Sequence, residues 1–174
     1  MKSINKTSKV FAFLAIVTCS LWIGSYLSRL FVSYQLFEAR DLSLKPYLNQ
    51  VNINGILTTL LPSITTSFVL YISFIVFFFL FIVISRINLR FNGWLFIIAI
   101  IICITMPFEV YLMTIDYKLI IQLNTGLFDS NSLIELIRKR VHILGSFPLI
   151  EIFCYLSFYY FLLFRPLTKK SNEN

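Results

Sequence analysis

Three ionisable residues, Arg29, Glu109 and Glu151, lie inside stretches of the sequence that are otherwise apolar. A charge at the centre of a bilayer costs at least about 2.5–3.5 kcal/mol, so such residues are usually paired and often functional. Glu109 can be neutralised by Arg29, whose long side chain can also reach toward the membrane surface. Glu151 is harder to accommodate, and we expect it to be protonated, to pair with Arg29 and a hydroxyl of Tyr26 or Tyr155, or to meet a partner protein. These three residues are the candidate intramembrane polar cluster and partner-binding site.

Other kinds of chemistry have little support in the sequence. It contains neither the G-x-S-x-G motif of serine hydrolases nor the H-E-x-x-H motif of zinc proteases. Cys19, Cys103 and Cys154 lie in apolar stretches without C-x-x-C spacing, and His142 has no Cys, His or carboxylate at ligand spacing. The net charge of +7 comes without a basic patch interleaved with aromatic residues. We therefore expect no enzymatic activity, no cofactor, no metal and no nucleic-acid partner.

The composition indicates an integral membrane protein. Only 13% of the residues are charged, whereas soluble domains carry about a quarter. Four apolar stretches reach the roughly 20 residues that cross a bilayer, and helices satisfy their own backbone hydrogen bonds in lipid. We predict an all-α four-helix membrane bundle, a single transmembrane domain over residues 1–174. Its helices are expected at about 10–34, 58–85, 94–115 and 143–164.

The first apolar stretch has an alternative interpretation as a cleaved signal peptide, because VFAFLAIVTCS follows three lysines. Thr18 is a poor residue before the cysteine of a lipoprotein cleavage site, and the apolar stretch continues past it. These features favour a first helix that is retained.

Basic residues predict that both termini are cytoplasmic. Three groups of them flank the expected helices without any acidic residue among them. They are Lys2, Lys6 and Lys9, then Arg86 and Arg90, then Arg165, Lys169 and Lys170. The other two loops carry mixed charges, although the basic run at 138–140 argues against this orientation. With both termini in the cytoplasm, Arg29, Glu109 and Glu151 all fall in the outer half of the membrane.

The second outer loop contains a possible short interfacial helix at 131–140. Ser130 or Asn131 could cap it, and its apolar residues would lie on one side with the charges on the other. Simple continuation into the fourth membrane helix is the alternative.

Prolines and polar stripes suggest how the helices bend and meet. Pro107 and Pro148 precede the two glutamates, and each is expected to kink its helix. Two stripes share a helix face and are expected to make contacts between helices. They are Cys19, Trp22, Tyr26 and Arg29 on the first helix, and Thr59, Ser63, Thr66 and Ser73 on the second.

Several short segments resemble the immunity proteins that protect bacteria from pore-forming colicins of the A and B type. The segments are LPSIT at 61–65, the FE pair at 108–109 and the closing LLFRPLTKK. The resemblance implies four helices, an inner-membrane location and immunity to a pore-forming bacteriocin. It also implies a membrane-inserted toxin domain as the partner, with Arg29, Glu109 and Glu151 specifying the contact.

Other functions remain open on the sequence alone. The chain could be an accessory subunit or small carrier of a larger membrane complex, or a protein that excludes plasmid or phage DNA. These alternatives share the same requirement for helix–helix contact with another membrane component, and the oligomeric state is left open.

Overall fold

The computed structural model describes residues 5–38, 40–49, 52–126, 129–143 and 147–168, and it is all-helical. Its described residues form five α-helices and no β-strand. The helices are α1 (Lys6–Gln35), α2 (Ile53–Ser85), α3 (Gly93–Thr125), α4 (Ser130–Ile143) and α5 (Phe147–Phe164). Four of them, α1, α2, α3 and α5, are long and apolar enough to cross a membrane. The prediction of an all-α fold with four apolar spans is confirmed to this extent.

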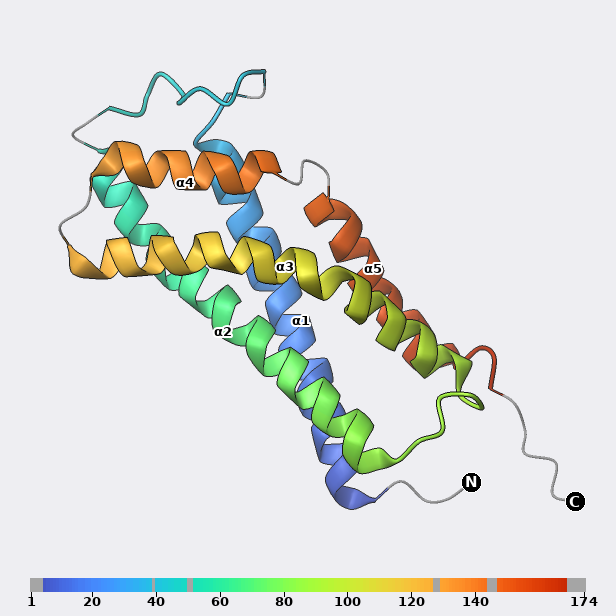
Figure 1. Cartoon of the computed structure of the whole chain (residues 1–174). Helices are drawn as coiled ribbons and strands as arrows, with labels where there is room; N and C mark the ends of the chain where they lie inside the picture. The colour runs from blue at the N-terminus through green and yellow to red at the C-terminus, as the bar shows by residue number, and fades with distance from the viewer. Residues whose placement is uncertain (1–4, 39, 50–51, 127–128, 144–146, 169–174) are drawn as a thin grey trace, which may run out of the picture.

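The four long helices run alternately up and down between two ends of the bundle (Figure 1). We call the end where α1 begins and α5 finishes the terminal end, and the opposite end, where α4 lies, the α4 end. At the terminal end, the Gly93 N–H donates to the Leu167 carbonyl at 3.2 Å, which joins the start of α3 to the segment after α5. A Cβ at position 93 would lie 2.7 Å from the Leu167 Cβ, so glycine permits this close approach.

Three predicted helix boundaries differ from the structure: α1 begins at Lys6 instead of about 10, α2 begins at Ile53 instead of about 58, and the third span ends later than expected. The third span does not end at 115 but continues to Thr125, because Asp116 is neutralised by two arginines and Leu119 and Leu123 remain buried. The short helix α4 covers the segment expected at 131–140 and runs from Ser130 to Ile143. The fourth span, expected from 143, is described from Phe147 onward, and residues 144–146 lie outside the described residues.

The two prolines have different effects. Pro107 lies in the middle of α3, which changes direction near its midpoint in Figure 1, as expected for a proline inside a helix. Pro148 is the second residue of α5, where the missing N–H would have had no helical partner. The predicted kink at Pro148 is therefore wrong, because this proline starts a helix.

The cap of α4 also differs from the prediction. The Asp129 carboxylate accepts the backbone N–H groups of Asn131 and Ser132 at 3.2 and 3.1 Å. Asp129, rather than Ser130 or Asn131, thus satisfies the free N–H groups at the start of the helix.

The interior divides into two apolar cores. The first lies toward the terminal end and includes Trp22, Tyr71, Phe74 and Tyr155. The second lies toward the α4 end, where residues of α2, the last turns of α3 and α4 meet. The side chains of α2 that enter these cores are large and apolar, except for that of Ser67, which is small. The predicted contact stripe on this helix is wrong, because Thr59 and Thr66 are exposed.

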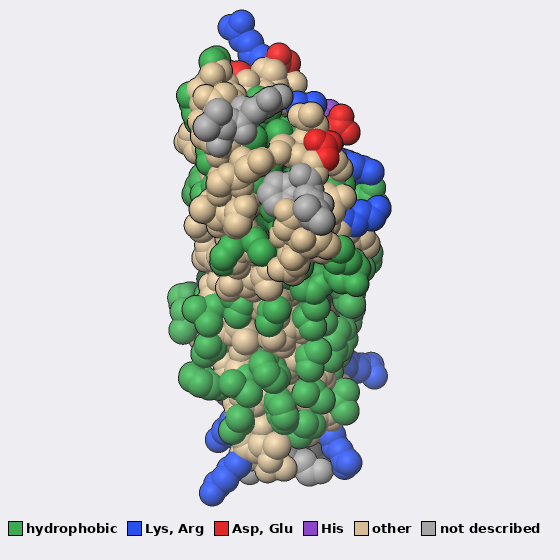
Figure 2. All heavy atoms as spheres, turned by 90° about the vertical axis from the view of Figure 1, so that its left-hand side faces the viewer, with side chains coloured by type: hydrophobic (Ala, Val, Ile, Leu, Met, Phe, Trp, Pro, Cys, Tyr) green, Lys and Arg blue, Asp and Glu red, His purple; other side chains and the backbone are tan. Residues whose placement is uncertain are grey.

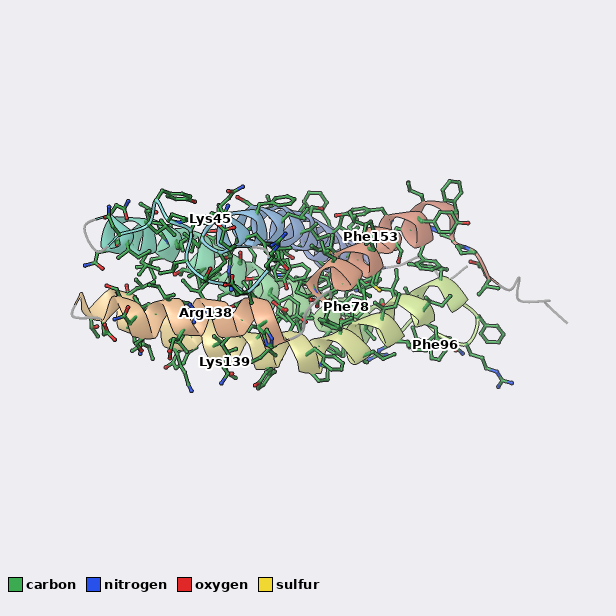
Figure 3. All side chains as sticks on the ribbon, turned by 90° about the horizontal axis from the view of Figure 1, so that it is seen from above. Lys45, Phe78, Phe96, Arg138, Lys139 and Phe153 are labelled. Carbon is green, nitrogen blue, oxygen red and sulfur yellow. The ribbon has the colours of Figure 1, made fainter. Side chains whose placement is uncertain are left out.

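Exposed apolar side chains cover the lateral surface, and charged groups gather at the ends (Figure 2). In Figure 3, Phe78 lies between helices, whereas Phe96 of α3 and Phe153 of α5 lie at the outside of the bundle. Lys139 is exposed on α4, while Arg138 on the same helix donates to the Leu42 carbonyl at 3.0 Å. A wide apolar surface of this kind is stable only against lipid or protein.

Candidate functional site

Five ionisable side chains from four helices meet between the two apolar cores. We call them the ionic cluster: Arg29 of α1, Glu109 and Asp116 of α3, Arg140 of α4 and Glu151 of α5. All five are buried, with relative exposures of 6%, 2%, 1%, 9% and 0% in that order. Buried charges of this kind persist only where they are paired and hydrogen-bonded.

Asp116 is the centre of the ionic cluster. It accepts two hydrogen bonds from Arg29, one of them from Nη1 to Oδ2 at 2.9 Å, in the paired geometry that suits a guanidinium and a carboxylate. Arg140 donates from Nε to Oδ1 of the same carboxylate at 2.7 Å. One carboxylate therefore joins α1, α3 and α4.

The three residues predicted from the sequence are brought together, but their partners differ from those expected. Arg29 pairs with Asp116 and not with Glu109, whose Oε1 lies 3.6 Å from Nη2 of Arg140. The carboxyl of Glu151 lies beside the carboxyl of Glu109. No N–H or hydroxyl group of the described residues donates to either oxygen of Glu151.

Sequence reasoning missed Asp116 and Arg140, which it assigned to a loop. The signal for Asp116 was the apolar series Leu112, Ile115, Leu119 and Leu123, whose helical spacing continues past the charge. Arg140 lies three residues after Ile137, and this spacing places it on the apolar face of α4. The prediction that all charges of this helix lie on its outer side is thus wrong for Arg140.

Arg140 is held in its charged form by its surroundings. Burial disfavours the charge, but the carboxylates of Asp116 and Glu109 more than compensate and hold the pKa of Arg140 above its usual value. Its guanidinium carbon also lies 5.6 Å from the centroid of the Tyr26 ring. Tyr26, Arg29 and Arg140 line a cavity of about 30 Å³. This cavity is large enough to hold a water molecule.

A group of aromatic rings packs next to the ionic cluster, on the side that is nearer the terminal end. The Trp22 ring centroid lies 5.1 Å from those of Tyr26 and Tyr71 and 5.0 Å from that of Tyr155. The Tyr155 hydroxyl is 3.0 Å from Thr105 Oγ1. The predicted stripe of α1 is confirmed as an inward face, because Cys19, Trp22, Tyr26 and Arg29 are all buried.

A groove lies between α2 and α3 on the lateral surface. It has a volume of about 540 Å³, within the roughly 300–1,000 Å³ of typical binding sites. Its lining is almost wholly apolar and includes Ile72 and Val76 of α2 and Met106 and Val110 of α3. Lys118 lines the part of the groove nearest the α4 end.

These two features allow different chemistry. The ionic cluster is enclosed and can hold helices together or bind a proton, but a partner at the surface does not reach it. The groove can take an apolar ligand or a helix. Among the described residues, no group of three His, Cys, Asp or Glu side chains could hold a metal ion.

Comparisons with known proteins leave the family undetermined, since no family model, curated protein or solved structure matches this chain.

Proposed function

We propose that this chain is a multi-pass protein of the inner membrane that acts without catalysis, by lateral contact with another membrane protein. The proposed partner is the membrane-inserted domain of a pore-forming bacteriocin, against which the chain gives immunity. Four apolar helices and an apolar lateral surface support insertion into a bilayer.

The distribution of charge supports an orientation with the terminal end in the cytoplasm. Lys6, Lys9, Arg86, Arg90 and Arg165 lie near helix termini at this end, whereas Figure 2 shows acidic and basic side chains mixed at the opposite end. Basic residues beside membrane helices favour the cytoplasmic side. Lys2, Lys169 and Lys170, which entered the prediction, lie outside the described residues.

The groove between α2 and α3 is the observation that carries the proposal. The ionic cluster is buried, so Arg29, Glu109 and Glu151 contribute to recognition only by holding the helices in place. The groove is open along the lateral face and apolar, as a transmembrane helix of a partner requires. Lys118 at its outer end favours a partner helix with an acidic residue at the same level, and such polar contacts decide between partners in lipid.

Two of the three segments that resemble colicin immunity proteins lie close in sequence to residues of this groove. Residues 61–65, LPSIT, lie within α2 and precede the groove-lining Phe68 by one turn. On α3, the FE pair at 108–109 is followed directly by the groove-lining Val110. None of the residues in these two segments lines the groove itself, and Glu109 is buried in the ionic cluster, so the resemblance places these segments near the groove in the chain without assigning them to its surface.

Filling the groove tests this function. Val76→Trp places a bulky ring in the groove, and we expect the bacteriocin concentration that cells tolerate to fall at least about tenfold, or about 1.4 kcal/mol of binding. The measurement is survival of cells that express each variant, against a panel of pore-forming toxins. Val83→Trp is the matched control, since it makes the same change on an exposed position of α2 outside the groove.

The outcomes separate the proposed functions. Full protection by Val76→Trp at wild-type expression would exclude the groove as the contact surface. If the wild type protects against no pore-forming toxin, the immunity proposal fails. Loss of a co-purifying membrane complex in Val76→Trp alone would then favour an accessory subunit.

A further inference from the structure

The charges of the ionic cluster do not balance when all its members are ionised. Two guanidinium groups, those of Arg29 and Arg140, face three carboxyl groups, those of Glu109, Asp116 and Glu151. All five side chains are buried, and an uncompensated charge in such a site is strongly destabilising. A neutral cluster requires one proton on one of the three carboxyl groups.

The geometry points to the carboxyl group that holds this proton. Asp116 receives hydrogen bonds from both arginines, which stabilise it as an anion. Oε1 of Glu109 lies 3.6 Å from Nη2 of Arg140, an ion-pair contact that Glu151 lacks. Glu151 is fully buried and forms no salt bridge in the described part of the chain. Its neighbour is the carboxyl of Glu109, and two carboxyl groups form a hydrogen bond only when one carries a proton.

We propose that Glu151 and Glu109 form a proton-binding site between α5 and α3, in which protonated Glu151 donates to ionised Glu109. The proton comes from the solvent when the chain folds and returns to it on unfolding. This site goes beyond the proposed immunity function and does not depend on it. Its effect is to dock α5 against α3 without burying a net charge.

The other groups around Glu151 are compatible with this assignment. Tyr26 of α1, Tyr71 of α2 and Tyr155 of α5 face the same region, and Arg140 of α4 is the nearest guanidinium. Arg29 and Asp116 complete the surroundings and are paired with each other. The Tyr155 hydroxyl is within hydrogen-bonding distance of Thr105 and Tyr71. The buried Tyr26 hydroxyl has no hydrogen-bond partner among the described residues, so neither hydroxyl donates to Glu151, and a proton on Glu151 itself lets the two acids lie side by side.

Infrared spectroscopy tests the site, because protonated and ionised carboxyl groups absorb at different frequencies. In the purified full chain in lipid nanodiscs at pH 7, we expect one protonated carboxyl that is lost in Glu151→Gln. It should persist in Glu135→Gln, which changes an exposed glutamate of α4. Absence of a protonated carboxyl in the wild type, or its persistence in Glu151→Gln, would overturn the proposal.

The pH dependence of unfolding gives a second measurement. A folded state that binds one proton more than the unfolded state loses stability as pH rises, by about tenfold in the folding equilibrium constant per pH unit. Between about pH 6 and pH 8 an exposed glutamate of the unfolded chain is already ionised, so this slope applies there. Glu151→Gln should fold and lose the slope, while Glu135→Gln keeps it. Equal slopes in Glu151→Gln and the wild type would contradict the site.

Discussion

Asp116→Asn is expected to destabilise the folded protein by about 3–5 kcal/mol, the cost of removing one partner from a buried ion pair. Asparagine keeps the shape of the side chain but removes the negative charge that accepts hydrogen bonds from Arg29 and Arg140. Arg29 then has no carboxylate partner among the described residues, and α4 loses a strong attachment to α3. Unfolding of the purified protein by sodium dodecyl sulfate in mixed micelles measures the loss.

Two variants test whether the loss of the partner of Arg29 is the cause. Arg29→Gln combined with Asp116→Asn removes one charge of each sign, and we expect the double variant to be more stable than Asp116→Asn alone. Asp41→Asn is the control, because Asp41 is exposed in the loop after α1. The Ser43 N–H donates to the Asp41 carboxylate at 3.1 Å and holds the pKa of this acid below its usual value. Wild-type stability of Asp116→Asn would show that the ionic cluster contributes little to the fold.

Trp22→Ala is expected to destabilise the protein by about 3 kcal/mol, the lower limit for truncating a buried tryptophan. The lower limit applies because lipid and the protein interior solvate apolar groups equally well, so the transfer of the side chain between them contributes little. The main cost is the packing that is lost. Trp22 is fully buried and contacts the rings of Tyr26, Tyr71 and Tyr155, which come from three helices. The same unfolding assay measures this loss.

Leu21→Ala is the matched control for Trp22→Ala. Leu21 is the preceding residue of α1 and is 55% exposed, so its truncation leaves no internal cavity. If Leu21→Ala lowered the stability as much as Trp22→Ala, the loss would come from weaker helix formation and not from lost packing.

Because the ionic cluster is buried and the groove lies at the surface, substitutions in the two places are expected to affect different properties, the stability of the fold and the recognition of a partner. Substitutions in the cluster are expected to change the amount of folded protein, because its side chains are buried. Substitutions in the groove are expected to change partner binding at constant expression, because residues such as Val76 are partly exposed at the lateral surface. Under the proposed function, Glu109→Gln and Glu151→Gln variants that fold normally should therefore still protect against a pore-forming toxin, contrary to the role that the resemblance implies for these acids.

The sequence by itself determined the helical class and the inward face of α1. Long apolar stretches can satisfy their backbone groups in lipid only as helices, and the spacing of Cys19, Trp22, Tyr26 and Arg29 is a local property of one helix. It also indicated that Arg29, Glu109 and Glu151 need polar or oppositely charged partners, because isolated charges are costly in an apolar medium.

Only the tertiary structure decided which charges meet. Arg29 and Asp116 are 87 residues apart, and their contact depends on how far α3 continues after Pro107. Arg140 reaches the same carboxylate because the chain reverses after Gly126, whose φ of 67° suits glycine, and α4 then packs back onto α3. Periodicity along one helix specifies a face but not the neighbour of that face. Ion pairs, the shared proton and the groove therefore follow from the packing of helices that are distant in sequence.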